Sequence, residues 1–162
     1  GIAMHLANVL GEKGTLISVE IREEHAQVGK QNMDRLKEIL PEFPDWHLLV
    51  GDLIDAGDKV ESICGNIDAA IIDMAEPWTV VDSIIPTLRI GGRIACYCPT
   101  TSQLEKSWNA CEEAGLEIEW AGEMIERKWS KASKGGVRPG NQPMGHTAFL
   151  IIAAKIASEE EE

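Results

Sequence analysis

The chain has 162 residues, of which 44% are hydrophobic, and its formal net charge at pH 7 is −12. This length and composition predict one domain with one sizeable core. The acidic balance argues against a broad nucleic-acid-binding surface, because phosphates are held chiefly by Lys and Arg. No stretch reaches the roughly 18 consecutive apolar residues that a membrane span needs, so we expect a cytoplasmic protein without a membrane partner.

Basic residues gather in one part of this acidic chain. Five of them, and no acidic residue, lie between positions 127 and 146. A loop of this length is usually functional or disordered. The final residues are acidic, so we place a folded domain at 1–155 and an acidic tail at 156–162. The five basic residues are Arg127, Lys128, Lys131, Lys134 and Arg138.

The four cysteines show neither a CxxC pair nor histidines at the spacing of metal ligands. Cys96 and Cys98 are two residues apart on one predicted strand, so their side chains point to the same face. We therefore expect reduced core thiols and no metal site. The four residues are Cys64, Cys96, Cys98 and Cys111.

Predicted helices and strands alternate through the first half of the chain. The first element is a helix over 1–11 that ends at a glycine, and no strand precedes it. A nucleotide-binding α/β unit would have its first strand and glycine turn there, so we expect an N-terminally truncated chain whose first strand is missing. Apolar patterns and turn residues then predict a strand at 15–20, a helix at 23–40, a strand at 47–50, a helix at 58–64 and a strand at 67–72.

The second half keeps this alternation until its last two strands. A cap at Thr79 predicts a helix that ends before Pro86, and a capping box from Ser102 to Glu105 predicts a helix that ends at Gly115. Between these helices, residues 88–92 are predicted to turn and residues 93–97 to form a strand.

The last two predicted strands, 116–126 and 147–154, follow each other without a helix between them. We therefore expect them to pair as an antiparallel hairpin that is bridged by the basic loop.

The apolar run at 67–72 predicts a strand buried on both faces, as in the middle of a parallel sheet. Asp73 follows it directly, and a Pro77-Trp78 turn comes next. Ligands of open α/β sheets lie outside the carboxyl ends of the strands, so we expect Asp73 and Trp78 at the mouth of a binding crevice. Alternatively, Asp73 caps the next helix and Trp78 fills a gap between loop and sheet.

Two other predicted strands also end in carboxylates. Glu20 has the place of the acid that accepts both ribose hydroxyls of a bound nucleoside, a feature shared by NAD enzymes and S-adenosylmethionine enzymes. Asp52 would accept a hydrogen bond from an adenine amino group, or else is an acid solvated at the start of a loop. We expect Glu20, Asp52 and Asp73 to point into a shared hollow.

Several segments together resemble the tRNA (adenine-58, N1)-methyltransferase family, over nearly the whole chain from Gly1 to about Lys155. The Asp-to-Pro-Trp turn and the Gly-His-Thr strand start are fairly specific to that family, whereas the Gly-Gly-Arg turn is common to many methyltransferases. Ala75 departs from the pattern, since the family usually has proline there. The segments are 19–20, 51–53, 72–78, 91–100 and 136–150.

The resemblance implies an α/β fold with the Rossmann-like sheet of class I S-adenosylmethionine-dependent methyltransferases and a C-terminal antiparallel hairpin. It implies the catalytic chain of the archaeal and bacterial type, a homotetramer that methylates N1 of adenine 58 in the T-loop of tRNA with S-adenosylmethionine as cofactor. The implied cofactor residues are Gly1, Glu20, Asp52, Leu53 and Asp73. The implied catalytic residues are Asp73 and Tyr97, and the implied RNA-binding residues are Trp78, Arg138 and His146.

Alternative interpretations remain at each level. Tyr97 would otherwise be a core tyrosine, the basic loop a solvated excursion, and His146 a hydrogen-bonded residue at a strand end. The whole chain would otherwise be a methyltransferase of the same fold with a small-molecule or protein substrate, or a non-catalytic RNA-binding subunit. The three strand-end acids favour the enzyme, because a subunit freed from chemistry has no physical need of them.

Overall fold

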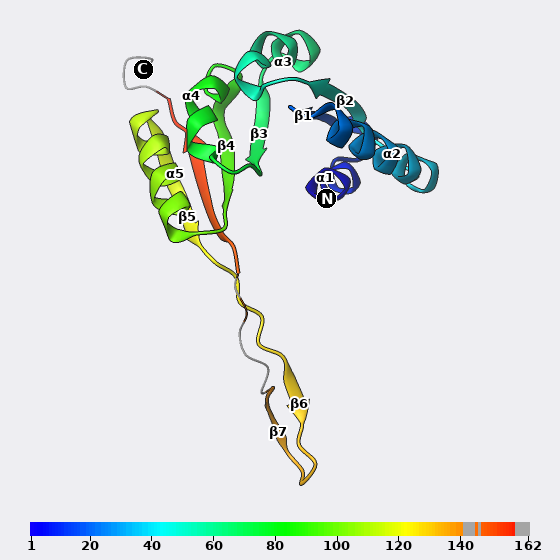
Figure 1. Ribbon diagram of the computed structural model, residues 1–162, viewed down its shortest axis with the longest axis vertical. Helices are drawn as coiled ribbons and strands as arrows, with labels where there is room; N and C mark the ends of the chain where they lie inside the picture. The colour runs from blue at the N-terminus through cyan, green and yellow to red at the C-terminus, as the bar shows by residue number, and fades with distance from the viewer. Residues whose placement is uncertain (141–144, 146, 158–162) are drawn as a thin grey trace. The chain divides into compact units, whose positions relative to one another are not determined.

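The computed structural model describes residues 1–140, 145 and 147–157, and His146 lies outside this range (Figure 1). The chain folds as two compact units. Unit 1 comprises Gly1–Ile67 and Ser83–Arg89, and unit 2 comprises Asp68–Asp82 and the chain from Ile90 onward. No helix in the described part of the chain is long and apolar enough to cross a membrane.

Unit 1 is built on two parallel strands, β1 (Thr15–Glu20) and β2 (Asp45–Val50), which are connected by the long helix α2 (Glu23–Ile39). Helix α1 (Ile2–Leu10) packs against β1 and α2. Ala7, Leu16 and Met33 form the buried cluster that joins these helices to the strands. The shorter elements are η1 (Gly11–Lys13), η2 (Leu53–Asp55) and α3 (Gly57–Cys64).

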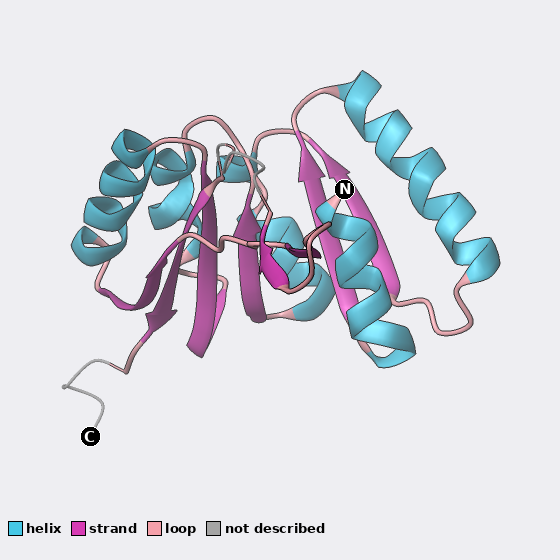
Figure 2. Ribbon diagram, turned by 90° about the horizontal axis from the view of Figure 1, so that it is seen from below, coloured by secondary structure: helices cyan, strands magenta, loops and turns pink. Residues whose placement is uncertain are grey.

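Unit 2 contains a sheet of four strands in the order β3-β4-β8-β5, and α5 (Thr101–Glu113) packs against β5 and β8. Figure 2 shows the helices of the structure in cyan and its strands in magenta. The core lies under this helix, where Ile94, Cys96 and Cys98 of β4 and Ile151 of β8 are buried. The strands are β3 (Ile67–Ile72), β4 (Leu88–Cys98), β5 (Leu116–Gly122) and β8 (Phe149–Lys155).

Hydrogen bonds at both ends show that β3 and β4 run parallel. Ile67 N, at the start of β3, donates to Thr87 O just before β4 at 2.8 Å. The side chain of Gln103, which follows β4, donates to Ala75 O, which follows β3, at 2.9 Å. β8 pairs antiparallel with both β4 and β5. The α/β fold and the antiparallel pairing of the last two sheet strands are therefore confirmed.

The prediction that a helix begins at a Thr79 cap is wrong. The chain forms η3 (Pro77–Val80) and then α4 (Val81–Ile84). Pro77 begins η3, where its fixed φ suits the first position of a helix. Thr79 Oγ1 donates instead to Glu76 O at 2.7 Å.

The turn predicted at residues 88–92 is also wrong, because β4 runs through this segment. Gly91 adopts a φ of 76° within the strand, a conformation that glycine takes at little cost. The glycine pair that indicated a turn is thus accommodated inside a long strand.

The capping box of α5 lies two residues earlier than predicted. Thr100 is the N-cap, its side chain accepts from Gln103 N, and the Gln103 side chain accepts from Thr100 N. Ser102 and Glu105 therefore lie inside the helix. Thr100 has an extended backbone, with φ −128° and ψ 156°, as an N-cap requires.

The expectation that 67–72 is buried on both faces is wrong. β3 is an edge strand of its sheet, and α5 packs against the strands at the other edge. Ile72 is buried, but Ile71 is 42% exposed. The apolar run therefore predicted the strand correctly but not its position at the edge of the sheet.

The basic segment 127–146 contains structure of its own, contrary to the predicted loop. β6 (Trp129–Lys131) and β7 (Val137–Pro139) pair antiparallel, with Ser130 opposite Arg138. Gly135 and Gly136 both have positive φ, which lets the chain reverse between two short strands.

Three of the four cysteines are buried free thiols, as predicted, whereas Cys64 is exposed. Hydrogen bonding with Cys111 and burial raise the pKa of Cys96, so this thiol stays protonated in the core. Cys64 lies in the last turn of α3, next to Gly65, outside that core.

Replacing Ile151 by Ala tests the core of unit 2. Ile151 is 1% exposed, and truncation of a buried isoleucine leaves a cavity that costs about 2–5 kcal/mol. Urea unfolding should show a loss of this size. Ile156→Ala is the matched control, because Ile156 is 53% exposed and its loss should change the unfolding free energy by no more than about 0.5 kcal/mol. Equal losses in the two variants would contradict this placement of the core.

Candidate functional site

Two of the predicted site residues meet at one edge of unit 1. Glu20 is the last residue of β1 and pairs with Val50, the last residue of β2. Gly51 N donates to Glu20 O at 3.1 Å, and Asp52 follows. Because the strands are parallel, both carboxylates leave the sheet at its carboxyl edge.

The Glu20 carboxylate is held by the residue that caps α2. Its Oε1 accepts from Arg22 N at 3.0 Å and from Arg22 Nε at 3.2 Å. The backbone N–H of Arg22 lowers the pKa of Glu20, burial opposes this shift, and the Arg22 guanidinium lowers the pKa further. Its Oε2 has no hydrogen-bond partner within the described ranges. One oxygen therefore fixes the side chain and the other remains available to a ligand.

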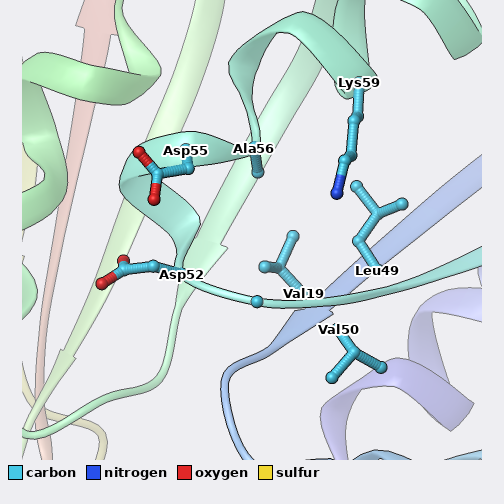
Figure 3. A pocket seen from close by; sticks show the side chains of 8 residues that line it. Val19, Leu49, Val50, Asp52, Asp55, Ala56 and Lys59 are labelled. Atoms are coloured by element: carbon cyan, nitrogen blue, oxygen red, sulfur yellow. The ribbon is translucent and has the colours of Figure 1, made fainter.

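A hollow of about 200 Å³ lies beside Asp52 (Figure 3). Val19 and Leu49, from the ends of β1 and β2, form apolar parts of its wall. The Asp52 and Asp55 carboxylates lie on one side, and the Lys59 ammonium points toward Val19 and Leu49 (Figure 3). Asp52 Oδ1 accepts from Ile54 N at 3.0 Å, which fixes this carboxylate at the start of η2.

These groups match the chemistry of a nucleoside. The hollow offers apolar contact for a flat base, and Asp52 and Glu20 offer acceptors for amino and hydroxyl groups. Gly1 is the N-cap of α1, and Leu53 is the half-buried first residue of η2. Neither of these two residues lines the hollow, and Glu20 and Asp73 are not among its lining residues either.

Two other predicted site residues lie at the carboxyl ends of neighbouring strands in unit 2. Asp73 directly follows β3, and Tyr97 is the next-to-last residue of the parallel neighbour β4. Both side chains are exposed, Tyr97 to 42%. The interpretation of Tyr97 as a core residue is therefore wrong.

Asp73 does not cap the next helix. Glu76 holds the N-cap position of η3 and makes no side-chain cap hydrogen bond. In the part of the chain that the structure describes, the Asp73 carboxylate has no hydrogen-bond or ion-pair partner. It is therefore available to an incoming ligand.

Trp78 is half-buried in η3, behind Asp73. Lys106 of α5 places its Nζ 4.6 Å from the centroid of the Trp78 ring, a distance at which the ammonium is attracted to the ring face. One face of this ring is therefore covered from within unit 2. Arg138 is exposed on β7.

The structure thus brings together Glu20 with Asp52 in unit 1, and in unit 2 it puts Asp73 and Tyr97 at the carboxyl ends of neighbouring parallel strands. Convergence of all three acids on one hollow stays a prediction. Sequence reasoning missed Asp55 and Lys59, which follow Asp52 at a spacing without a distinctive motif, and it missed the contacts of Gln103 and Lys106. Among the described residues, no group of three or more His, Cys, Asp or Glu side chains is arranged to hold a metal ion.

The chain is similar to known proteins in its sequence and in its fold. The family described as the tRNA methyltransferase complex GCD14 subunit matches residues 1–134. The chain is 28% identical to the tRNA (adenine(57)-N(1)/adenine(58)-N(1))-methyltransferase TrmI of Methanocaldococcus jannaschii, covering 94% of this chain and 60% of the relative. It is 28% identical to the tRNA (adenine(58)-N(1))-methyltransferase TrmI of Thermus thermophilus, covering 93% and 56%. The chain therefore spans little more than half the length of these relatives.

Solved structures support the same fold. A SAM-dependent O-methyltransferase from Thermotoga maritima matches with a TM-score of 0.75 and 27% identity, covering 95% of this chain and 54% of that one. The tRNA (m1A58) methyltransferase TrmI of Aquifex aeolicus matches with a TM-score of 0.69 and 22% identity, covering 90% and 55%. The class I methyltransferase fold is therefore confirmed. Because the family match covers most of the chain and agrees with the resemblance in its motifs, the protein belongs to the tRNA methyltransferase complex GCD14 subunit family.

Proposed function

We propose that the protein transfers a methyl group from S-adenosylmethionine to N1 of adenine 58 in the T-loop of tRNA. The main structural support is that Asp73 and Tyr97 are both exposed and lie at the carboxyl ends of the neighbouring parallel strands β3 and β4. The Asp73 carboxylate has no partner within the described residues, as a group that receives a substrate requires. The M. jannaschii and T. thermophilus relatives are named for methylation of adenine N1.

Unit 1 has side chains suited to hold the cofactor. Glu20 would accept ribose hydroxyls through its free Oε2, and Asp52 would accept the adenine amino group. Val19 and Leu49 would contact the flat base. Gly1, the N-cap of α1, and Leu53, the first residue of η2, are the other cofactor residues that the family resemblance implies. When bound, S-adenosylmethionine supplies an electrophilic methyl group next to a positively charged sulfur.

Asp73 and Tyr97 would act on the adenine that receives the methyl group. Adenine N1 carries an in-plane lone pair and needs no prior deprotonation, so alignment is the enzyme's main task. Asp73 would accept a hydrogen bond from the exocyclic amine and offset the positive charge that builds up as N1 is alkylated. The target base must leave its stack, and contacts with Tyr97 and Trp78 would compensate for this loss.

The tRNA would also contact the basic segment. Arg138 is exposed on β7, and Lys131 is exposed on the paired strand β6, where both can reach phosphates. We further propose RNA binding through Arg138 and His146 and a homotetramer, which rest on the family resemblance, and a cytoplasmic location, which rests on the sequence pattern alone.

Replacing Asp73 by Asn tests its proposed role in catalysis. The amide keeps the size of the side chain but removes the negative charge, so kcat should fall about 100-fold or more. The Kd for S-adenosylmethionine, measured by calorimetry, should stay within about twofold. Asp82→Asn is the control, since Asp82 is an exposed acid in α4, and it should retain full activity. Unchanged kcat in Asp73→Asn would refute the role.

Replacing Glu20 by Gln tests the cofactor site. Loss of a charged acceptor should raise the Kd for S-adenosylmethionine about tenfold, because hydrogen bonds to charged groups contribute about 1.5–3 kcal/mol. The exposed acid Glu24 of α2 provides the control variant Glu24→Gln. Calorimetry that shows no cofactor binding by the unaltered full-length protein would instead favour the non-catalytic RNA-binding subunit.

Replacing Arg138 by Ala tests the RNA contact. The variant should bind tRNA more weakly, and the slope of log K against log salt concentration should become shallower by about one, as expected for one lost phosphate contact. Arg35→Ala removes an exposed arginine from α2 and should leave both quantities unchanged. Filter-binding titrations at several salt concentrations make the comparison, and the same slope in Arg138→Ala would speak against the contact.

A further inference from the structure

The turn between β3 and η3 carries Asp73 but has few restraints of its own. Residues 73–76 are all exposed. Ala75 leaves both backbone dihedrals free, whereas a proline would fix φ. The hydrogen bonds of Glu76 O with Thr79 N, at 3.1 Å, and with Thr79 Oγ1 fix the start of η3. They do not reach back to Asp73, so the turn needs a restraint from outside.

Gln103 provides such a restraint. Its Nε2 donates to Ala75 O at 2.9 Å, across 28 positions of sequence. This bond ties the backbone two residues after Asp73 to the first turn of α5. A second restraint lies one helical turn further on, where the Lys106 ammonium covers the ring of Trp78. Pro77, between the two contacts, is fully buried.

The other end of the Gln103 amide fixes its orientation. Oε1 accepts from Thr100 N at 3.0 Å and from Thr100 Oγ1 at 2.9 Å. The Thr100 backbone N–H can only donate, so the amide atom that faces it must be the oxygen. Nε2 is therefore directed at Ala75. The capping box of α5 thus orients the donor that holds the turn.

We propose that Gln103 is a positioning residue for methyl transfer, which holds the Asp73 turn against α5 through its bond to Ala75 O. This inference rests on the proposed function, because the position of Asp73 matters only if its carboxylate acts on the substrate. The contribution is indirect, since Gln103 acts through the backbone that carries Asp73. Small displacements of a catalytic group lower rates strongly.

The variant Gln103→Glu isolates this contact. A carboxylate still accepts from Thr100 and keeps the capping box, for which glutamate is well suited. It has no N–H to donate, and one of its oxygens faces the Ala75 carbonyl. Asn109→Asp is the matched control, because it makes the same amide-to-acid change at an exposed position of α5. Thr100→Ser keeps the hydroxyl and serves as the conservative variant of the cap.

Steady-state kinetics, cofactor binding, hydrogen–deuterium exchange and thermal unfolding of the full-length protein test the proposal. In Gln103→Glu, kcat should fall roughly five- to tenfold, the effect of one lost hydrogen bond, while KM for tRNA and the Kd for S-adenosylmethionine stay within about twofold. Hydrogen–deuterium exchange of residues 73–80 should become faster, and the unfolding temperature should stay unchanged. Asn109→Asp and Thr100→Ser should match the unaltered protein in all of these.

Each other result has a definite meaning. Unchanged exchange at residues 73–80 would show that Gln103 does not hold the turn and would overturn the proposal. Faster exchange with unchanged kcat would overturn the positioning role. An unaltered protein without methyltransferase activity on tRNA would refute the proposed function, and the exchange comparison would still decide whether the contact restrains the turn.

Discussion

Parallel pairing of neighbouring strands is the constraint on which the candidate site depends. Parallel strands end at the same edge of a sheet, so residues far apart in sequence leave it next to one another. In unit 1 this pairing places Glu20 beside the segment of Asp52. In unit 2 it brings Asp73 and Tyr97 to the same edge of the sheet. Without it, the same side chains would be isolated surface groups.

The second requirement is that these side chains be held and yet remain able to bind. Glu20 uses one oxygen to accept from Arg22 and keeps the other free. Asp52 uses Oδ1 to accept from Ile54 N. Asp73 has no such local bond within the described residues, and the backbone behind it is fixed instead by Gln103. Restraint thus comes from the loop itself in unit 1 and from a neighbouring helix in unit 2.

The sequence predicted what depends on local pattern and on shared motifs. Strands ending in Glu20 and near Asp73, helix α2, and the final antiparallel pair follow from apolar runs and turn residues, and the structure has them. Prediction from the sequence failed where the burial or the role of a residue depends on its three-dimensional surroundings. Ile71 belongs to an apolar run but is exposed, because β3 is an edge strand. Ser102 and Thr100 are both residue types that cap helices, and Thr100 is the N-cap because its backbone is extended where the helix begins. The bond from Gln103 to Ala75 is a tertiary contact that no spacing indicates.

The most direct test is the chemical identity of the product. tRNA is incubated with the full-length protein and S-adenosylmethionine labelled in its methyl group, then digested and analysed by mass spectrometry of nucleosides. The label should appear in 1-methyladenosine, at position 58 when fragments are sequenced. Label on another atom or another nucleoside, or no label in the RNA, would contradict it.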